Sequence, residues 1–230
     1  MRFEVGPAGD LGLRLMFAAS PAPALTHKLL SIQKAAQQQF ANSLTDSVVG
    51  YSTLTLFYRP LTLERNRATE WLMEQAEAAS SFDIDPASRD EIIVLPVLYH
   101  PSVAPDLEWI ADSKSLSIDA IINLHCGADY FAYATGFAPG FCYLGEIPQQ
   151  LATPRLGAPR PLVPAGAVAI ADRQTAVYPC ESPGGWRLIG SCPTTLFSLN
   201  SAPAARLSVG DTVRFQPVSE ADYQSLRNAL

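Results

Sequence analysis

Two arginines carry the clearest chemistry in the sequence, and they lie in a stretch rich in Gly and Pro, Gly136–Pro193. Arg155 and Arg160 each follow a proline directly, and the fixed φ of proline stiffens the backbone before each guanidinium. A preorganised guanidinium suits a carboxylate or a phosphate. Residues 147–187 contain four arginines against two acidic residues in a chain of net charge −6. This local excess of positive charge predicts a small anionic ligand.

Aromatic residues are spaced through the same stretch. Phe137 and Tyr143 lie within Gly136–Gly145, among glycines that permit tight turns. We expect a stiff loop that presents aromatic faces to a cavity. Tyr178 and Ser182 flank a proline turn and extend the expected ligand-binding surface. Ser182 does not lie in a G-x-S-x-G elbow, which argues against a catalytic serine.

Two further side chains are candidates for catalysis. His125 ends a predicted short helix, where the helix dipole favours a protonated imidazole, and it would suit a general acid or base. Gln174 precedes a predicted strand, and its amide offers a substrate both a donor and an acceptor. The structural alternatives are a packed or capping histidine, a loop amide bonded to backbone, and arginines in surface ion pairs.

Composition narrows the possible partners. The net charge of −6 argues against nucleic acid or an anionic membrane as the main partner. The four cysteines form no C-x-x-C pair and the three histidines are scattered, so we expect reduced thiols and no metal site. The sequence has no long apolar run, no signal sequence and no G-x-x-x-x-G-K-[ST] loop. These absences favour a cytoplasmic protein without a standard ATP site.

The spacing of apolar residues predicts a small α+β domain over residues 1–98. Leu13, Leu15 and Phe17 alternate with other residues, as in a half-buried strand. Further strands are predicted at 48–58 and 91–99, and helices at 25–40 and 64–79. The order ββαβαβ implies a sheet with both helices on one face.

Residues 99–230 read as a second domain that opens with helices and continues with short strands. Asp106 and Ser117 are predicted to cap helices at 107–114 and 117–125. Short strands are predicted at 130–135, 168–171, 175–178, 186–189, 194–197 and 212–215, with a last helix from residue 220. Many short strands separated by Gly and Pro suggest a closed or nearly closed barrel.

Five segments, taken in order, resemble the signature of the family of 5-oxoprolinase B subunits, which is also described as allophanate hydrolase subunit 1 or Kip inhibitor-like protein. They are Gly136–Gly145 (GFAPGFCYLG), Pro154–Gly166 (PRLGAPRPLVPAG), Gln174–Pro179 (QTAVYP), Glu181–Gly190 (ESPGGWRLIG) and Gly210–Phe215 (GDTVRF). The resemblance covers nearly the whole chain and extends to part of the carboxyltransferase region of urea carboxylase. Ala167 and Ala176 depart from the Ser and Gly that are usual there.

The resemblance implies that residues 99–230 form a cyclophilin-like β-barrel. It also implies two partners, the C subunit of 5-oxoprolinase, with a related barrel, and the A subunit. Together they would open 5-oxo-L-proline to L-glutamate with hydrolysis of ATP, at an ATP site that is non-standard or completed by a partner. Arg155 and Arg160 would then hold anionic oxygens, and the chain alone would be inactive. His125 and Gln174 would position the ring amide.

Two other functions stay open within the same family. One is a Kip-type regulator that binds a sensor histidine kinase and blocks its autophosphorylation. The other is a component of an allophanate- or urea-processing enzyme. That enzyme would need biotin on another chain, because this one has no biotinyl Met-Lys sequence.

Overall fold

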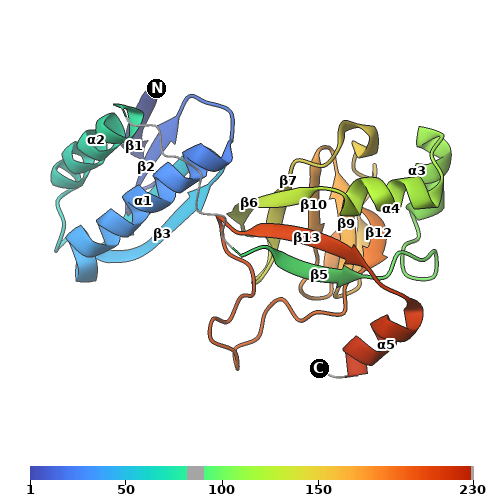
Figure 1. Ribbon diagram of the computed structural model, residues 1–230. Coiled ribbons are helices and arrows are strands. Elements are labelled where there is room, and N and C mark those ends of the chain that lie inside the picture. Colours follow the sequence, from blue (N-terminus) through green and yellow to red (C-terminus); the bar gives the residue numbers. More distant parts are fainter. Residues whose placement is uncertain (82–90, 229–230) are drawn as a thin grey trace. The chain divides into compact units, whose positions relative to one another are not determined.

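The computed structural model describes residues 1–81 and 91–228. The chain divides into two compact units, Met1–Arg89 and Asp90–Leu230. Both contain helices and mainly antiparallel strands (Figure 1), so the protein is a mixed α/β structure. Within the described ranges, none of the helices combines the length and the apolar character that a membrane crossing requires.

The first unit is a sheet with two helices on one face. Its strands follow the order β1-β2-β4-β3, and each neighbouring pair is antiparallel. Helix α1 packs on β3 and β4, and α2 packs on β1 and β2. The elements are β1 (Phe3–Pro7), β2 (Gly12–Phe17), α1 (Pro23–Phe40), the 3₁₀ turn η1 (Ala41–Ser43), β3 (Leu44–Gly50), β4 (Thr53–Tyr58) and α2 (Arg65–Ser81).

Alternation along the strands explains why the helices rest on one face. Leu13 and Leu15 of β2 are buried, whereas Arg14 between them is exposed. The register places Leu56 and Leu54 of β4 opposite these two leucines, and both are buried as well. Side chains alternate across a strand, so β2 and β4 present one apolar face, which the helices cover.

Two expectations for the first unit are corrected by the structure. The segment 48–58, expected as one strand, is part of the hairpin of β3 and β4, because Tyr51 adopts a positive φ of 55° at its turn. The strand expected at 91–99 is β5 (Ile93–Val97), which pairs in parallel with β13 of the second unit. The order of the first unit is therefore ββαββα, and its compact body ends before β5.

The second unit is a ring of strands in the order β5-β13-β6-β7-β10-β9-β12. The ring closes because Leu98, directly after β5, and Ser191 of β12 exchange two backbone hydrogen bonds of 2.9 Å. A separate pair, β8 with β11, lies outside this path. The strands are β5, β6 (Asp129–Thr135), β7 (Cys142–Gly145), β8 (Arg160–Val163), β9 (Ala167–Ala171), β10 (Gln174–Val177), β11 (Ser182–Gly184), β12 (Arg187–Ser191) and β13 (Thr212–Pro217).

Helices complete the second unit: α3 (Leu107–Lys114), α4 (Ile118–Cys126) and α5 (Glu220–Asn228), with the 3₁₀ turn η2 (Gln149–Leu151). Ser117 caps α4 as predicted, because its hydroxyl accepts from the Ala120 N–H at 3.1 Å. Asp106 occupies the cap position of α3, but its side chain makes no cap bond. No strand forms at 194–197, where Phe197 makes a single bridge to Ala205.

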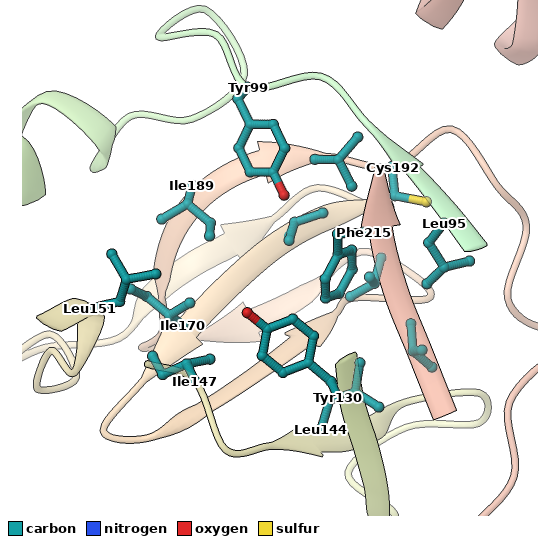
Figure 2. Packing of buried hydrophobic residues seen from close by; sticks show 14 of the residues in the cluster. Leu95, Tyr99, Tyr130, Leu144, Ile147, Leu151, Ile170, Ile189, Cys192 and Phe215 are labelled. Carbon is teal, nitrogen blue, oxygen red and sulfur yellow. The ribbon is translucent and has the colours of Figure 1, made fainter. Parts of the chain in front are cut away.

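The interior of the ring is a continuous apolar core. Aromatic residues fill its centre, where the side chains of Tyr99, Tyr130 and Phe215 extend among aliphatic ones (Figure 2). Leu144 and Ile170 pack in the same cluster and are fully buried. Because such cores are closely packed, this interior holds the strands in place.

Candidate functional site

A small cavity outside the ring brings together the aromatic residues of the Gly- and Pro-rich stretch. We call it the aromatic pocket; it encloses about 190 Å³. Four residues predicted as ligand-binding line it: Phe137, Tyr143, Arg155 and Tyr178. The other lining residues are Phe141, Leu156, Pro159, Gly184, Gly185 and Trp186.

Phe141 is the centre of the ring cluster. Its ring centroid lies 4.9 Å from that of Tyr143 and 5.4 Å from that of Tyr178, and both pairs are edge-to-face. The Phe137 and Trp186 centroids lie 5.2 Å and 5.8 Å from it, again edge-to-face. Aromatic pairs prefer this geometry, and each is worth about 1 kcal/mol beyond its buried area. The rings are therefore held in position before any ligand arrives.

Small residues let the aromatic layer lie close to the sheet. Ala167 and Ala169 of β9 and Ala176 of β10 are buried beneath Phe141 and Tyr178, in one apolar cluster outside the ring core. A larger side chain at these positions would push the rings outward, because packed interiors tolerate added volume poorly. Ala167 and Ala176, which depart from the family's usual residues, thus belong to the apolar cluster that supports these rings and do not line the pocket itself.

Position 184 has room only for glycine, because the Tyr178 side chain lies directly against it. A Cβ at Gly184 would lie 2.4 Å from Tyr178 Oη and 2.9 Å from the ring. Burial raises the pKa of Tyr178, and a hydrogen bond from the Trp186 backbone and the charge of Arg155 act in the opposite direction. The phenol therefore stays protonated at neutral pH. It accepts from the backbone and keeps its own proton available for a ligand.

Phe137 forms the exposed rim of the pocket in an unusual backbone conformation. Its φ is +72°, and 59% of its surface is exposed. A positive φ is uncommon for a bulky residue and costs on the order of 1–3 kcal/mol. Its edge contacts with Phe141 and Tyr178 keep the ring over the pocket. An exposed aromatic residue held at such a cost is typical of a ligand-binding position.

Arg155 supplies the positive charge of the aromatic pocket. Its guanidinium carbon lies 5.8 Å from the Trp186 ring centroid, within the range of a cation–π contact. Of the four arginines between residues 147 and 187, Arg155 is the one that makes no ion pair with a carboxylate of residues 1–81 or 91–228. Its guanidinium donors are accordingly available to an anion beside the aromatic faces.

Arg160, expected to bind ligand beside Arg155, is instead held by Asp106. Its Nη2 lies 2.8 Å from both carboxylate oxygens of Asp106, and its Nη1 donates to the Trp186 carbonyl at 3.2 Å. Asp106 is 5% exposed and also accepts from the Leu188 N–H at 2.7 Å. Its oxygen lies 3.4 Å from Arg187 Nη1. Arg160 therefore supports the pocket wall and does not line the pocket.

His125 lies in the core of the ring and is completely buried. Its Nδ1 is 2.7 Å from Tyr99 Oη and its Nε2 is 2.9 Å from Thr175 Oγ1. Thr175 donates its own proton to the Ala169 carbonyl. The Thr175 oxygen thus accepts from Nε2–H, and Tyr99 donates to Nδ1. The ring also stacks on Phe215 at 4.6 Å.

The expectation of a protonated His125 is corrected by this environment. Burial lowers its pKa from 6.5 to about 3, which outweighs the dipole at the end of α4. Exchange of a proton with a substrate would require access that a fully buried ring lacks. Its place in the structure gives the predicted role in general acid–base catalysis no support.

The remaining predicted residues also lie outside the lining of the aromatic pocket. Gln174 begins β10, opposite Ala171 and Gly145. Ser182 begins β11, opposite Val163, and its buried Oγ has no hydrogen-bond partner in the part of the chain that the structure describes. Within the same ranges no three His, Cys, Asp or Glu side chains form a cluster able to hold a metal ion.

The sequence does not assign Phe141, Trp186 or Asp106 to the site. Phe141 belongs to the aromatic motif, and Trp186 is expected in the core. Both are buried, and both also line the pocket. Asp106 reads as a helix cap because it directly precedes an apolar helix. Its true partner, Arg160, is 54 residues away in sequence, and no local signal could have found it.

Comparison with known proteins agrees with the motifs. Residues 3–207 match the family described as carboxyltransferase domain, subdomain C and D. A Bacillus subtilis (strain 168) protein named as the B subunit of 5-oxoprolinase is 31% identical over 99% of this chain and 98% of its own. An Escherichia coli O157:H7 protein of the same name is 38% identical over 77% of this chain and 80% of its own.

One protein of known structure is similar to this chain in both sequence and fold. The crystal structure of TTHA0988 matches with a TM-score of 0.77 and 34% identity, over 90% of this chain and 40% of that one. The chain thus spans about two fifths of the length of that protein. Three findings indicate the same family: the five ordered motifs, the family match over most of the sequence, and the relatives that align over nearly their full length. The chain belongs to the family of 5-oxoprolinase B subunits.

Proposed function

We propose that the protein is one component of a cytoplasmic, ATP-dependent 5-oxoprolinase, which opens 5-oxo-L-proline to L-glutamate together with the A and C subunits of that enzyme. The names of its relatives support a place in a hydrolase complex. The closed ring of strands supports the cyclophilin-like barrel that the resemblance implies for the second domain. With no phosphate-binding loop in its sequence, the chain is expected to need its partners for turnover.

The observation that carries this proposal is Arg155, a cation without a carboxylate partner among the described residues, beside a small aromatic pocket. A volume of about 190 Å³ lies below the roughly 300 Å³ at which pockets for drug-sized ligands begin, so a single small ring is the expected occupant. The faces of Phe141 and Trp186 suit the apolar edge of a five-membered lactam. The guanidinium suits its carboxylate, and the protonated Tyr178 hydroxyl suits the lactam oxygen.

In the complete enzyme, ATP would make the lactam carbonyl a better electrophile. The lactam oxygen forms a bond to the γ-phosphorus while the bond from that phosphorus to ADP breaks. Water then adds to the activated ring carbon, the ring C–N bond breaks with protonation of nitrogen, and hydrolysis of the phosphorylated product releases phosphate and glutamate. The role of this chain is to hold the ring, through Arg155 at the carboxylate and Tyr178 at the oxygen.

Binding of the substrate tests the proposal without the partner subunits. We expect calorimetry on the full chain to show 5-oxo-L-proline binding at least about tenfold more tightly than 2-pyrrolidinone, the same ring without its carboxylate. In Arg155→Ala this preference should disappear. Arg173→Ala is the matched control, because Arg173 is an exposed arginine paired with Glu146 away from the pocket lining, and it should keep the preference.

Equal loss in both variants, or a preference that survives in Arg155→Ala, would contradict the assignment of the carboxylate site. A second result would contradict the enzyme role itself. If the chain recovers a sensor histidine kinase from its own cell extract and binds neither 5-oxoproline nor the partner subunits, the Kip-type function is correct instead.

A further inference from the structure

A second cavity is lined in part by Arg160, which does not line the aromatic pocket. We call it the α5 cleft; it encloses about 650 Å³ between helix α5 and the turns that follow β8 and β12. Among the described residues that line it, only Arg160 and Arg227 are charged, and both are positive. Hydroxyl groups of Ser102, Thr194 and Thr195 also line the cleft.

Helix α5 makes a buried side-chain hydrogen bond to the ring. Tyr223 is 6% exposed, and its Oη lies 2.8 Å from Ser191 Oγ of β12. Arg227 follows four residues later, on the same side of the helix, and both side chains line the cleft. Arg227 is exposed and makes no ion pair with a carboxylate of any described residue. The helix that Tyr223 joins to β12 thus places an available cation at the cleft.

Arg160 connects the α5 cleft to the aromatic pocket. It lines the cleft, while its Nη1 binds the carbonyl of Trp186, a wall of the pocket. Asp106 holds Arg160 and also contacts Arg187, so two guanidinium groups share one carboxylate. One positive charge of this group is left uncompensated. With Arg227 it makes the electrostatic environment of the cleft favourable to anions.

We propose that the α5 cleft binds ATP, with its phosphates toward Arg227 and Arg160. The charge and size of the cleft indicate a ligand with several negative charges and the size of a nucleotide. The choice of ATP among such ligands rests on the proposed function. Its volume falls within the roughly 300–1,000 Å³ of ligand pockets, unlike that of the aromatic pocket. Leu162 and Pro193 offer an apolar surface for a base, and hydroxyls beside arginines suit phosphate oxygens. Arg160 would then line the nucleotide site and hold Trp186, a wall of the substrate site.

Binding of ATP to the full chain tests this proposal. By calorimetry we expect ATP to bind, and adenosine to bind at least about tenfold more weakly because it lacks the phosphates. Arg227→Ala should weaken ATP binding about fivefold, the equivalent of roughly 1 kcal/mol. Arg173→Ala removes an equal charge away from the cleft lining and should leave ATP affinity within about twofold.

A steric variant tests the same cleft without changing charge. Ala165 is exposed and lines the cleft, so Ala165→Trp should fill it and weaken ATP binding by about tenfold or more. An unchanged thermal unfolding midpoint will show that this variant folds. The proposal is overturned if the wild-type chain binds no ATP, if adenosine binds as tightly, or if Arg173→Ala matches the loss in Arg227→Ala.

The outcomes for the two sites are separable. If ATP binding follows this pattern but 5-oxoproline binding does not depend on Arg155, the proposed function fails and the cleft still binds a nucleotide. If 5-oxoproline binds as expected and ATP does not bind, the cleft assignment fails and the proposed function stands.

Discussion

Arg160 Nη2 lies 2.8 Å from both carboxylate oxygens of Asp106, and this ion pair joins the start of α3 to strand β8. The same carboxylate accepts from the Leu188 N–H, and the same guanidinium donates to the Trp186 carbonyl. Trp186 lines the aromatic pocket, and Leu188 lines the α5 cleft. Asp106 is therefore a positioning residue for both cavities.

Replacing Asp106 with Asn should destabilise the fold. The carboxylate is 6% exposed, and its loss leaves two guanidinium groups without their shared counter-charge. Breaking a buried pair costs about 3–5 kcal/mol. Because a quarter of the Arg160 side chain is exposed to screening solvent, we expect a smaller loss of about 2 kcal/mol in the free energy of unfolding, measured with urea.

The matched control is Asp129→Asn. Asp129 also binds one arginine, Arg214, through 2.6 Å and 2.8 Å contacts, but both side chains are well exposed. Exposed pairs contribute little to stability, so this variant should unfold almost like the wild type. Equal losses in the two variants would show that Asp106 has no special structural role.

Much of the second unit was predictable from the sequence. Short β-branched and apolar runs between Gly and Pro located β6, β9, β10, β12 and β13, because their side-chain pattern is local. Strands β7, β8 and β11 were missed. The last two, Arg160–Val163 and Ser182–Gly184, contain proline and glycine and pair with each other. Pairing between distant segments is not a local property of the sequence.

The candidate site was predictable to a similar extent. The aromatic motif led to Phe137 and Tyr143, because clustered rings need a common apolar surface, and the turn at Pro179 led to Tyr178. The roles of Arg155 and Arg160 differ because the Asp106 carboxylate pairs with Arg160 and not with Arg155. Sequence spacing contains no information about that distance. His125 failed as a cation for the same reason: its burial depends on the whole ring of strands.

Gly184→Ala should disrupt the aromatic pocket. The added Cβ would lie 2.4 Å from Tyr178 Oη, so the phenol ring must move away from Phe141. We expect a loss of about 1–3 kcal/mol in stability and at least tenfold weaker binding of 5-oxoproline. Gly157→Ala is the control, since a Cβ there meets nothing within 4 Å. If Gly184→Ala binds 5-oxoproline with unaltered affinity, Tyr178 does not contribute to binding of this ligand.

The stability of the protein should depend on pH through His125. Its pKa is about 3 in the fold and 6.5 when exposed in the unfolded chain, so the unfolded chain binds more protons between these values. The contribution of neutral His125 is therefore complete above about pH 6.5. It decreases as the pH falls toward 3, by up to about 1.4 kcal/mol per pH unit. Urea unfolding at several pH values measures this slope.

His125→Gln should reduce this slope, because glutamine does not titrate. Other acid-sensitive groups, including the Asp129 carboxyl with its lowered pKa, contribute equally to both proteins, and the difference isolates His125. His100→Gln is the control, since His100 is exposed and its imidazole bonds the nearby Ser102. If the slope persists in His125→Gln and falls in His100→Gln, the imidazole in the core is not the titrating group.

Phe137→Asn should weaken ligand binding without lowering the stability of the fold. Asparagine tolerates a positive φ better than phenylalanine, so the change relieves strain at φ +72°. Because Phe137 is 59% exposed, little buried area is lost. We expect the free energy of unfolding to stay the same or rise by up to about 1 kcal/mol, while 5-oxoproline binds several-fold more weakly without the rim ring. Phe141→Asn, at a buried position, should lose both properties. A destabilised Phe137→Asn with normal affinity would mean that the strained ring serves packing and not the ligand.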